Sequence, residues 1–171
     1  MTEPDRPSDL ERGRALMRDA EAAMRDGVDR LAAAWVVREV TRIVDAWGRL
    51  DDGTRAQVLA GARMAGDDAR ARVLGELDAL FALAPAAQRA TPLQIVRSLR
   101  FEVTAVLSAA GIPDVVRDEF DARAFPDDRY GVVPKAFADL GDDELGPMLM
   151  AWGVGKTLVL RASTRDDSGD L

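Results

Sequence analysis

Apolar residues recur at intervals of three and four along most of this 171-residue chain, and this spacing limits its fold more than any other feature. The clearest example begins at Thr91, whose hydroxyl can cap a helix, and at Pro92, which suits the first helical position. Gly111 and Pro113 are typical of a helix end. The apolar residues between these signals share one helical face: Val96, Leu99, Val103, Val106 and Ala110. The pattern predicts one helix over residues 91–110.

A second strong pattern covers Val28–Leu50. Its apolar face is broad, and part of it steps by four and three, which is also the spacing of a coiled-coil seam. We therefore expect a core helix, and we keep a homodimer seam as the alternative. The residues of the broad face are Leu31, Trp35, Val36, Val40, Ile43, Trp47 and Leu50, and the homodimer would form through Val36, Val40, Ile43 and Trp47.

Further helices are expected at about residues 8–26, 54–65, 67–81, 113–124 and 147–162. Gly27 leaves open whether the first apolar region is one helix or two, and Gly66 is expected to end a helix because glycine weakens helix interiors. No segment has the alternation of a strand. We predict an all-α, irregular bundle of about six or seven helices in one domain, residues 8–162. Residues 84–91 allow a subdivision, and residues 1–7 and 163–171 are expected to be flexible tails.

The composition removes several classes of function. The chain has no cysteine and no histidine, which excludes disulfides and thiol chemistry and removes the commonest general base. Its 30 acidic and 23 basic residues give a net charge of −7, which disfavours binding to nucleic acid or to anionic membranes. No apolar run approaches the roughly 18 residues that a membrane span needs. With a polar, acidic N-terminal stretch, these features predict a cytoplasmic protein.

The helix at 91–110 and the expected helix at 113–124 suggest a helix-turn-helix. The second helix carries four acidic residues and two arginines, a charge of −4 + 2 = −2. A DNA-recognition helix approaches phosphates with basic side chains, so this charge favours a packed helical hairpin.

The segment Gly153–Thr157 (GVGKT) resembles the end of a phosphate-binding loop. The full pattern requires a glycine where Met150 stands, and it follows a strand, whereas this segment is expected inside a helix. We therefore favour close helix packing at Gly153 and Gly155 over nucleotide binding.

Carboxylates are concentrated between residues 114 and 128. Such oxygen ligands suit Mg²⁺ or Ca²⁺, but no EF-hand spacing is present, and the interspersed arginines favour solvated ion pairs. Paired carboxylates can run acid–base chemistry without histidine, yet no pair stands out, so no catalytic residue, metal or cofactor is predicted. The acidic residues are Asp114, Asp118, Glu119, Asp121, Asp127 and Asp128.

The segment Phe125–Val133 is predicted to be irregular and to follow a helix. Such segments often carry binding residues, and aromatic and arginine side chains dominate protein contacts. The alternative is that its two aromatic rings only pack the segment onto the core. The predicted interaction surface consists of Phe125, Asp127, Asp128, Arg129 and Tyr130.

Residues 111–140 (GIPDVVRDEFDARAFPDDRYGVVPKAFADL), together with Trp152–Lys156, resemble an uncharacterised helical family of high-GC Gram-positive bacteria. The resemblance covers the C-terminal half and implies a bacterial housekeeping or regulatory role without assigning any residue. We predict a non-catalytic interaction or regulatory protein whose partner is another protein. The alternative is a small-molecule-binding or hydrolytic bundle with a pocket near Tyr130 and the neighbouring acids.

Overall fold

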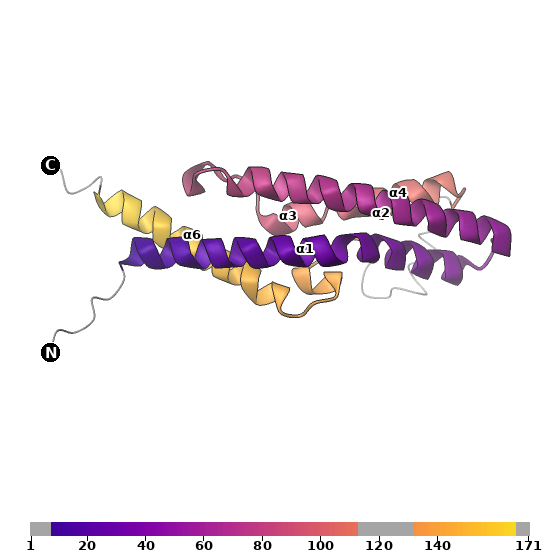
Figure 1. The fold of residues 1–171 in the computed structure, drawn as a ribbon, viewed down its shortest axis with the longest axis horizontal. Helices are drawn as coiled ribbons and strands as arrows, with labels where there is room; N and C mark the ends of the chain where they lie inside the picture. Colours follow the sequence, from indigo (N-terminus) through magenta and orange to yellow (C-terminus); the bar gives the residue numbers. More distant parts are fainter. Residues whose placement is uncertain (1–7, 113–131, 167–171) are drawn as a thin grey trace.

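The computed structural model describes residues 8–112 and 132–166, which are entirely helices and connecting turns (Figure 1). No strand occurs within these residues, so the all-α prediction is confirmed for them. The α-helices are α1 (Asp9–Trp47), α2 (Asp52–Phe81), α3 (Pro92–Val96), α4 (Leu99–Ala109) and α6 (Leu145–Asp166), and the short 3-10 helices are η1 (Pro85–Ala87) and η2 (Phe137–Leu140).

Helix α1 is the longest of the described helices, with a length of about 58 Å at the usual helical rise. Helices α2 and α6 both pack along it (Figure 1). Two ion pairs, Arg25–Asp78 and Arg70–Asp29, show that α2 runs antiparallel to α1. The core lies where these helices meet α4 and η2. Its largest fully buried side chains include Met24, Val36, Val40, Leu77, Leu99, Val103, Phe137 and Leu140.

The helix starts follow from side-chain caps. Ser8 and Glu11 form a capping box at α1, and Thr91 and Gln94 form another at α3, where a cap at Thr91 was predicted. Helix α2 begins at Asp52, slightly before the expected start near residue 54. Asp51 caps it, and its Oδ1 accepts a hydrogen bond from the backbone N–H of Thr54 over 2.9 Å.

The structure corrects the expected count of six or seven helices. Helix α1 continues through Gly27 and α2 continues through Gly66, so the described residues form only four helices longer than two turns. A Cβ on Gly66 would lie 2.8 Å from the carbonyl oxygen of Ala33 in α1. Gly66 therefore marks a close approach of two helices, where a larger residue does not fit, and not a helix end.

The predicted helix over residues 91–110 is divided into α3 and α4. Around Ser98 the backbone N–H groups donate to the carbonyl three residues earlier and not to the one four residues earlier, as in Ser98 to Ile95. The Ser98 hydroxyl also donates to the carbonyl oxygen of Ile95, over 2.7 Å, and so competes with the α-helical hydrogen bonds. The predicted end is confirmed. Gly111 has a φ of +74°, and the Ile112 N–H donates to the carbonyl oxygen of Leu107 over 3.0 Å.

The predicted homodimer seam is wrong for physical reasons. Val36, Val40 and Ile43 are buried within the core of a single chain, and Trp47 is partly buried against it. The spacing of four and three therefore belongs to the packing of α1 within its own bundle. A partner has no access to Val36, Val40 or Ile43.

Candidate functional site

The predicted interaction residues Phe125, Asp127, Asp128, Arg129 and Tyr130 lie outside the described residues, so that surface stays a prediction. The acidic residues considered as metal ligands lie there as well. Within residues 8–112 and 132–166, no group of three or more acidic side chains is arranged to hold a metal ion.

The segment that resembles a phosphate-binding loop lies inside α6. The Lys156 Nζ donates to the backbone oxygen of Gln88 over 2.8 Å and lies 5.1 Å from the centre of the Trp152 ring. A Cβ on Gly155 would meet the backbone oxygen of Gly13 at 2.7 Å, and a Cβ on Gly13 would meet that of Gly155 at the same distance. Close packing is therefore confirmed at Gly155, where α6 crosses α1.

The same interpretation is wrong at Gly153. No atom lies within 4 Å of a Cβ built there, because this glycine faces away from α1. Lys156 is anchored to η1, and its segment opens no helix. These contacts leave no cradle of backbone N–H groups for a phosphate.

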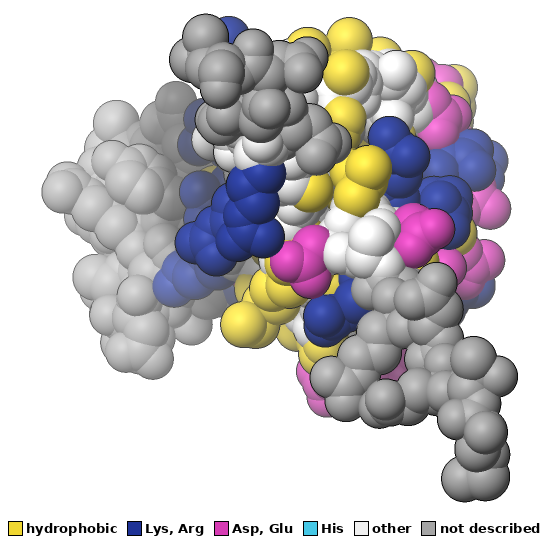
Figure 2. Space-filling view, turned by 90° about the vertical axis from the view of Figure 1, so that its left-hand side faces the viewer, with side chains coloured by type: hydrophobic (Ala, Val, Ile, Leu, Met, Phe, Trp, Pro, Cys, Tyr) yellow, Lys and Arg dark blue, Asp and Glu magenta, His cyan; other side chains and the backbone are white. Residues whose placement is uncertain are grey.

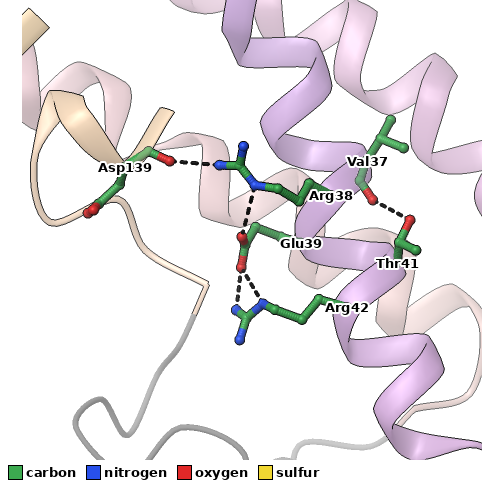
Figure 3. Close-up of polar contacts among 6 residues, drawn as sticks. All are labelled: Val37, Arg38, Glu39, Thr41, Arg42 and Asp139. Atoms are coloured by element: carbon green, nitrogen blue, oxygen red, sulfur yellow. Dashed lines mark hydrogen bonds and ion pairs between the residues drawn. The ribbon is translucent and has the colours of Figure 1, made fainter. Parts of the chain in front are cut away.

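A buried carboxylate on α1, that of Glu39, lies within a cluster of polar contacts (Figure 3). Glu39 is paired with Arg42, whose Nε donates to Glu39 Oε2 over 3.1 Å, and Glu39 Oε1 lies 3.8 Å from Arg38 Nε. Arg38 NH2 also donates to the backbone oxygen of Asp139 over 2.7 Å. The negative charge of Glu39 is thus balanced by two arginines. The hydrogen bond from Arg38 to Asp139 links α1 to η2.

A second carboxylate lies between α1 and α6. Glu21 Oε1 accepts a hydrogen bond from Trp152 Nε1 over 3.2 Å. Partial burial raises the pKa of Glu21, and the bond from Trp152 opposes this by favouring the charged form. Neither carboxylate faces a nucleophile or a second free acid among its described neighbours. Glu21 joins α1 to α6, and Glu39 holds the two arginines beside it on α1.

A shallow groove of about 350 Å³ lies between α2 and α4. Its walls carry no acidic or basic side chain, so it can accept a small apolar group but supplies no acid–base chemistry. The residues that line it are Thr54, Gln57, Val58, Gly61, Val106, Ala109 and Ala110.

The strongest candidate for a functional surface is the side of α6 that points away from α1. Met150 is 73% exposed and Val154, one turn further on, is 53% exposed. Between Leu145 and Leu160 the only charged residue is Lys156, and its amino group is held by Gln88. We call this surface the outward face of α6, and it consists of Gly146, Pro147, Met150, Gly153, Val154 and Thr157.

Two other exposed apolar side chains, Met64 and Phe101, lie beside charged groups. Met64 on α2 has Arg63, Asp67 and Asp68 as chain neighbours, and the guanidinium of Arg100 lies 4.7 Å from the centre of the Phe101 ring. Figure 2, which looks onto the end of the molecule where α1 begins and α6 ends, shows acidic and basic groups interspersed with hydrophobic ones. The outward face of α6 differs from these surroundings, because none of its six residues is charged.

Sequence reasoning missed the outward face, although a signal was present. Residues 145–160 are apolar around the whole helix circumference, whereas a helix that packs on one side needs only one apolar stripe. Such a helix is either buried on all sides or leaves an apolar face exposed, and the structure shows the second case.

Comparison with protein-family models, with characterised proteins and with solved structures finds no match. Within the described residues, no helix is both long enough and apolar enough to cross a membrane.

Proposed function

We propose that this chain is a non-catalytic, cytoplasmic interaction or regulatory protein that binds another protein through the outward face of α6. The observation that carries the proposal is the exposure of Met150 and Val154 on a helix face without charge. The cytoplasmic location is part of the proposal and rests on composition.

The composition of the outward face supports a protein partner. The centres of protein interfaces are depleted of charged residues and enriched in methionine, and contiguous exposed apolar surface on a monomer commonly marks a contact site. Gly146 and Gly153 have open space where a Cβ would lie, so the backbone of a partner can approach α6 closely.

The inner side of α6 supports the proposal because it holds the outward face rigid. Gly155 packs on Gly13, Trp152 donates to Glu21, and Lys156 donates to the backbone of Gln88. A helix held by these three contacts loses little conformational entropy when its exposed face binds a partner. The alternative function, a ligand pocket near Tyr130, draws no support from the described residues.

Site-specific photocrosslinking in cells tests the proposal. A photoreactive amino acid at Met150 is expected to crosslink to a protein partner, while the same group at Ala71, an exposed position on α2, serves as the matched control. Val154→Asp should abolish the crosslink and leave the circular dichroism unchanged, because Val154 is half-exposed. A crosslink yield no higher at position 150 than at position 71, or one that survives Val154→Asp, contradicts the proposal.

A further inference from the structure

We infer that the partner of the outward face of α6 is a second copy of this chain, docked with its α6 antiparallel to the first. The inference rests on the proposed function and specifies the partner of the same surface. Four exposed charged residues carry it, namely Asp143 and Glu144 before α6 and Arg161 and Arg165 in its last turns.

The charges are arranged so that the outward face is complementary to itself. Asp143 and Glu144 precede the uncharged face, and Arg161 and Arg165 follow it, with Asp166 as the last residue of α6. An antiparallel pair places the acids of each copy beside the arginines of the other, whereas a parallel pair would place like charges together. A two-fold dimer presents the same patch from both copies, so one favourable contact occurs twice.

The register follows from the spacing of the residues. In an antiparallel pair centred midway between Met150 and Val154, Met150 of each copy lies opposite Val154 of the other, and Pro147 lies opposite Thr157. Asp143, seven residues before Met150, then lies opposite Arg161, seven residues after Val154. Steps of four and seven keep to one side of a helix, and Asp143 lies in the turn directly before α6, so the uncharged and charged contacts form together.

These charged groups are available for a partner. Asp143, Glu144 and Arg161 make no ion pair with another described residue, and Arg165 lies 3.8 Å from Asp9, with both side chains largely exposed. Arginines on α1 and α2 differ, because several of them already pair within the chain. The pairs across these two helices are Arg25–Asp78, Arg70–Asp29 and Arg55–Asp45.

The size of the outward face determines how tightly the two copies are expected to bind. Helix α6 is about 33 Å long at the usual rise. One helix pair falls short of the roughly 1,200–2,000 Å² buried in stable complexes, so we expect a reversible dimer in the micromolar range. The close approach allowed by Gly146 and Gly153 increases the contact that this length provides.

Sedimentation velocity of the purified full-length chain over a concentration series tests the inference. The wild type should pass from monomer to dimer, and Val154→Arg should remain monomeric because it places two like charges at the centre of the pair. The matched control is Arg63→Glu, which changes an exposed arginine on α2 that has no ion pair with a described residue, and it should dimerise as the wild type does. Circular dichroism confirms that each variant is folded.

Charge reversal provides a more specific test of the antiparallel arrangement. Arg161→Glu with Arg165→Glu should weaken dimerisation by about tenfold or more, and Asp143→Arg with Glu144→Arg should do the same. The chain with all four changes should regain the wild-type affinity, since acids again face arginines.

Two kinds of result overturn the inference. One is a wild type that stays monomeric throughout, and the other is a dimer that survives Val154→Arg or is not rescued by the fourfold reversal. If position 150 still crosslinks to a different protein, only the second copy is excluded and the proposed function stands. If it crosslinks to nothing, the proposed function fails as well.

Discussion

The α1–α2 surface and the outward face of α6 are built in opposite ways. Across α1 and α2, exposed arginines pair with acids of the neighbouring helix, as in Arg25–Asp78 and Arg70–Asp29. The outward face of α6 has no charged side chain over about three turns, and it exposes Met150 and Val154. The comparison teaches that the first surface is completed by contacts within one chain, whereas the second has apolar groups that no other described residue covers.

The largest expected difference is between the effects on stability of truncating a side chain in the core and one on the outward face. Leu99 is fully buried, so Leu99→Ala should lower the free energy of unfolding by about 2–5 kcal/mol. Met150→Ala removes a similar volume from an exposed site and should change the stability of the monomer by less than about 0.5 kcal/mol. Denaturant unfolding of dilute protein measures both. Equal losses would show that Met150 packs within the chain.

Alanine substitution at two glycines of α6 should change the stability of the protein in opposite directions. Gly155→Ala introduces a Cβ that overlaps the backbone of α1 and should cost about 1–3 kcal/mol. Gly153→Ala has open space and should stabilise the helix by up to about 1 kcal/mol. Thermal unfolding of the two variants separates the inner and outward sides of α6. A loss of stability at Gly153 comparable to that at Gly155 is the result that the account does not allow.

The smallest effect concerns Glu21 on α1, which accepts a hydrogen bond from Trp152 on the inner side of α6. Its pKa is raised above the ordinary value of 4.5, chiefly by burial. The stability that a raised carboxyl pKa contributes is complete below the unfolded pKa and is lost as the pH rises through the folded pKa. Glu21→Gln keeps an acceptor for Trp152 without the charge, so its melting temperature should rise relative to the wild type between acidic and neutral pH. A difference that is constant with pH would refute this role.

The sequence predicted the parts of the fold that depend on local chemistry. The cap at Thr91, the left-handed Gly111 and the buried positions Leu99 and Val103 all follow from residue types and spacing. Glycine inside a helix was misinterpreted at Gly66, because a helix end and a close helix contact both favour glycine. Only the position of the second helix distinguishes them.

The candidate site was less accessible to prediction. Val36, Val40 and Ile43 have the spacing of a dimer seam, and their burial depends on where α2, α4 and α6 lie. Met150 and Val154 belong to an apolar segment, and the sequence does not show which of its sides meets α1. Exposure is a property of the assembled bundle, so the outward face became visible only in three dimensions.

The most direct test of the central claim uses two methionines as matched reporters. Met150 on α6 is 73% exposed and Met64 on α2 is 72% exposed, so an isolated chain should oxidise both at similar rates. Mass spectrometry after a brief peroxide treatment measures each rate separately. In concentrated protein, Met150 should be protected relative to Met64, and dilution or Val154→Arg should remove that protection. Equal oxidation of Met64 and Met150 both in cells and in concentrated solution would contradict the claim that the outward face of α6 binds a protein partner.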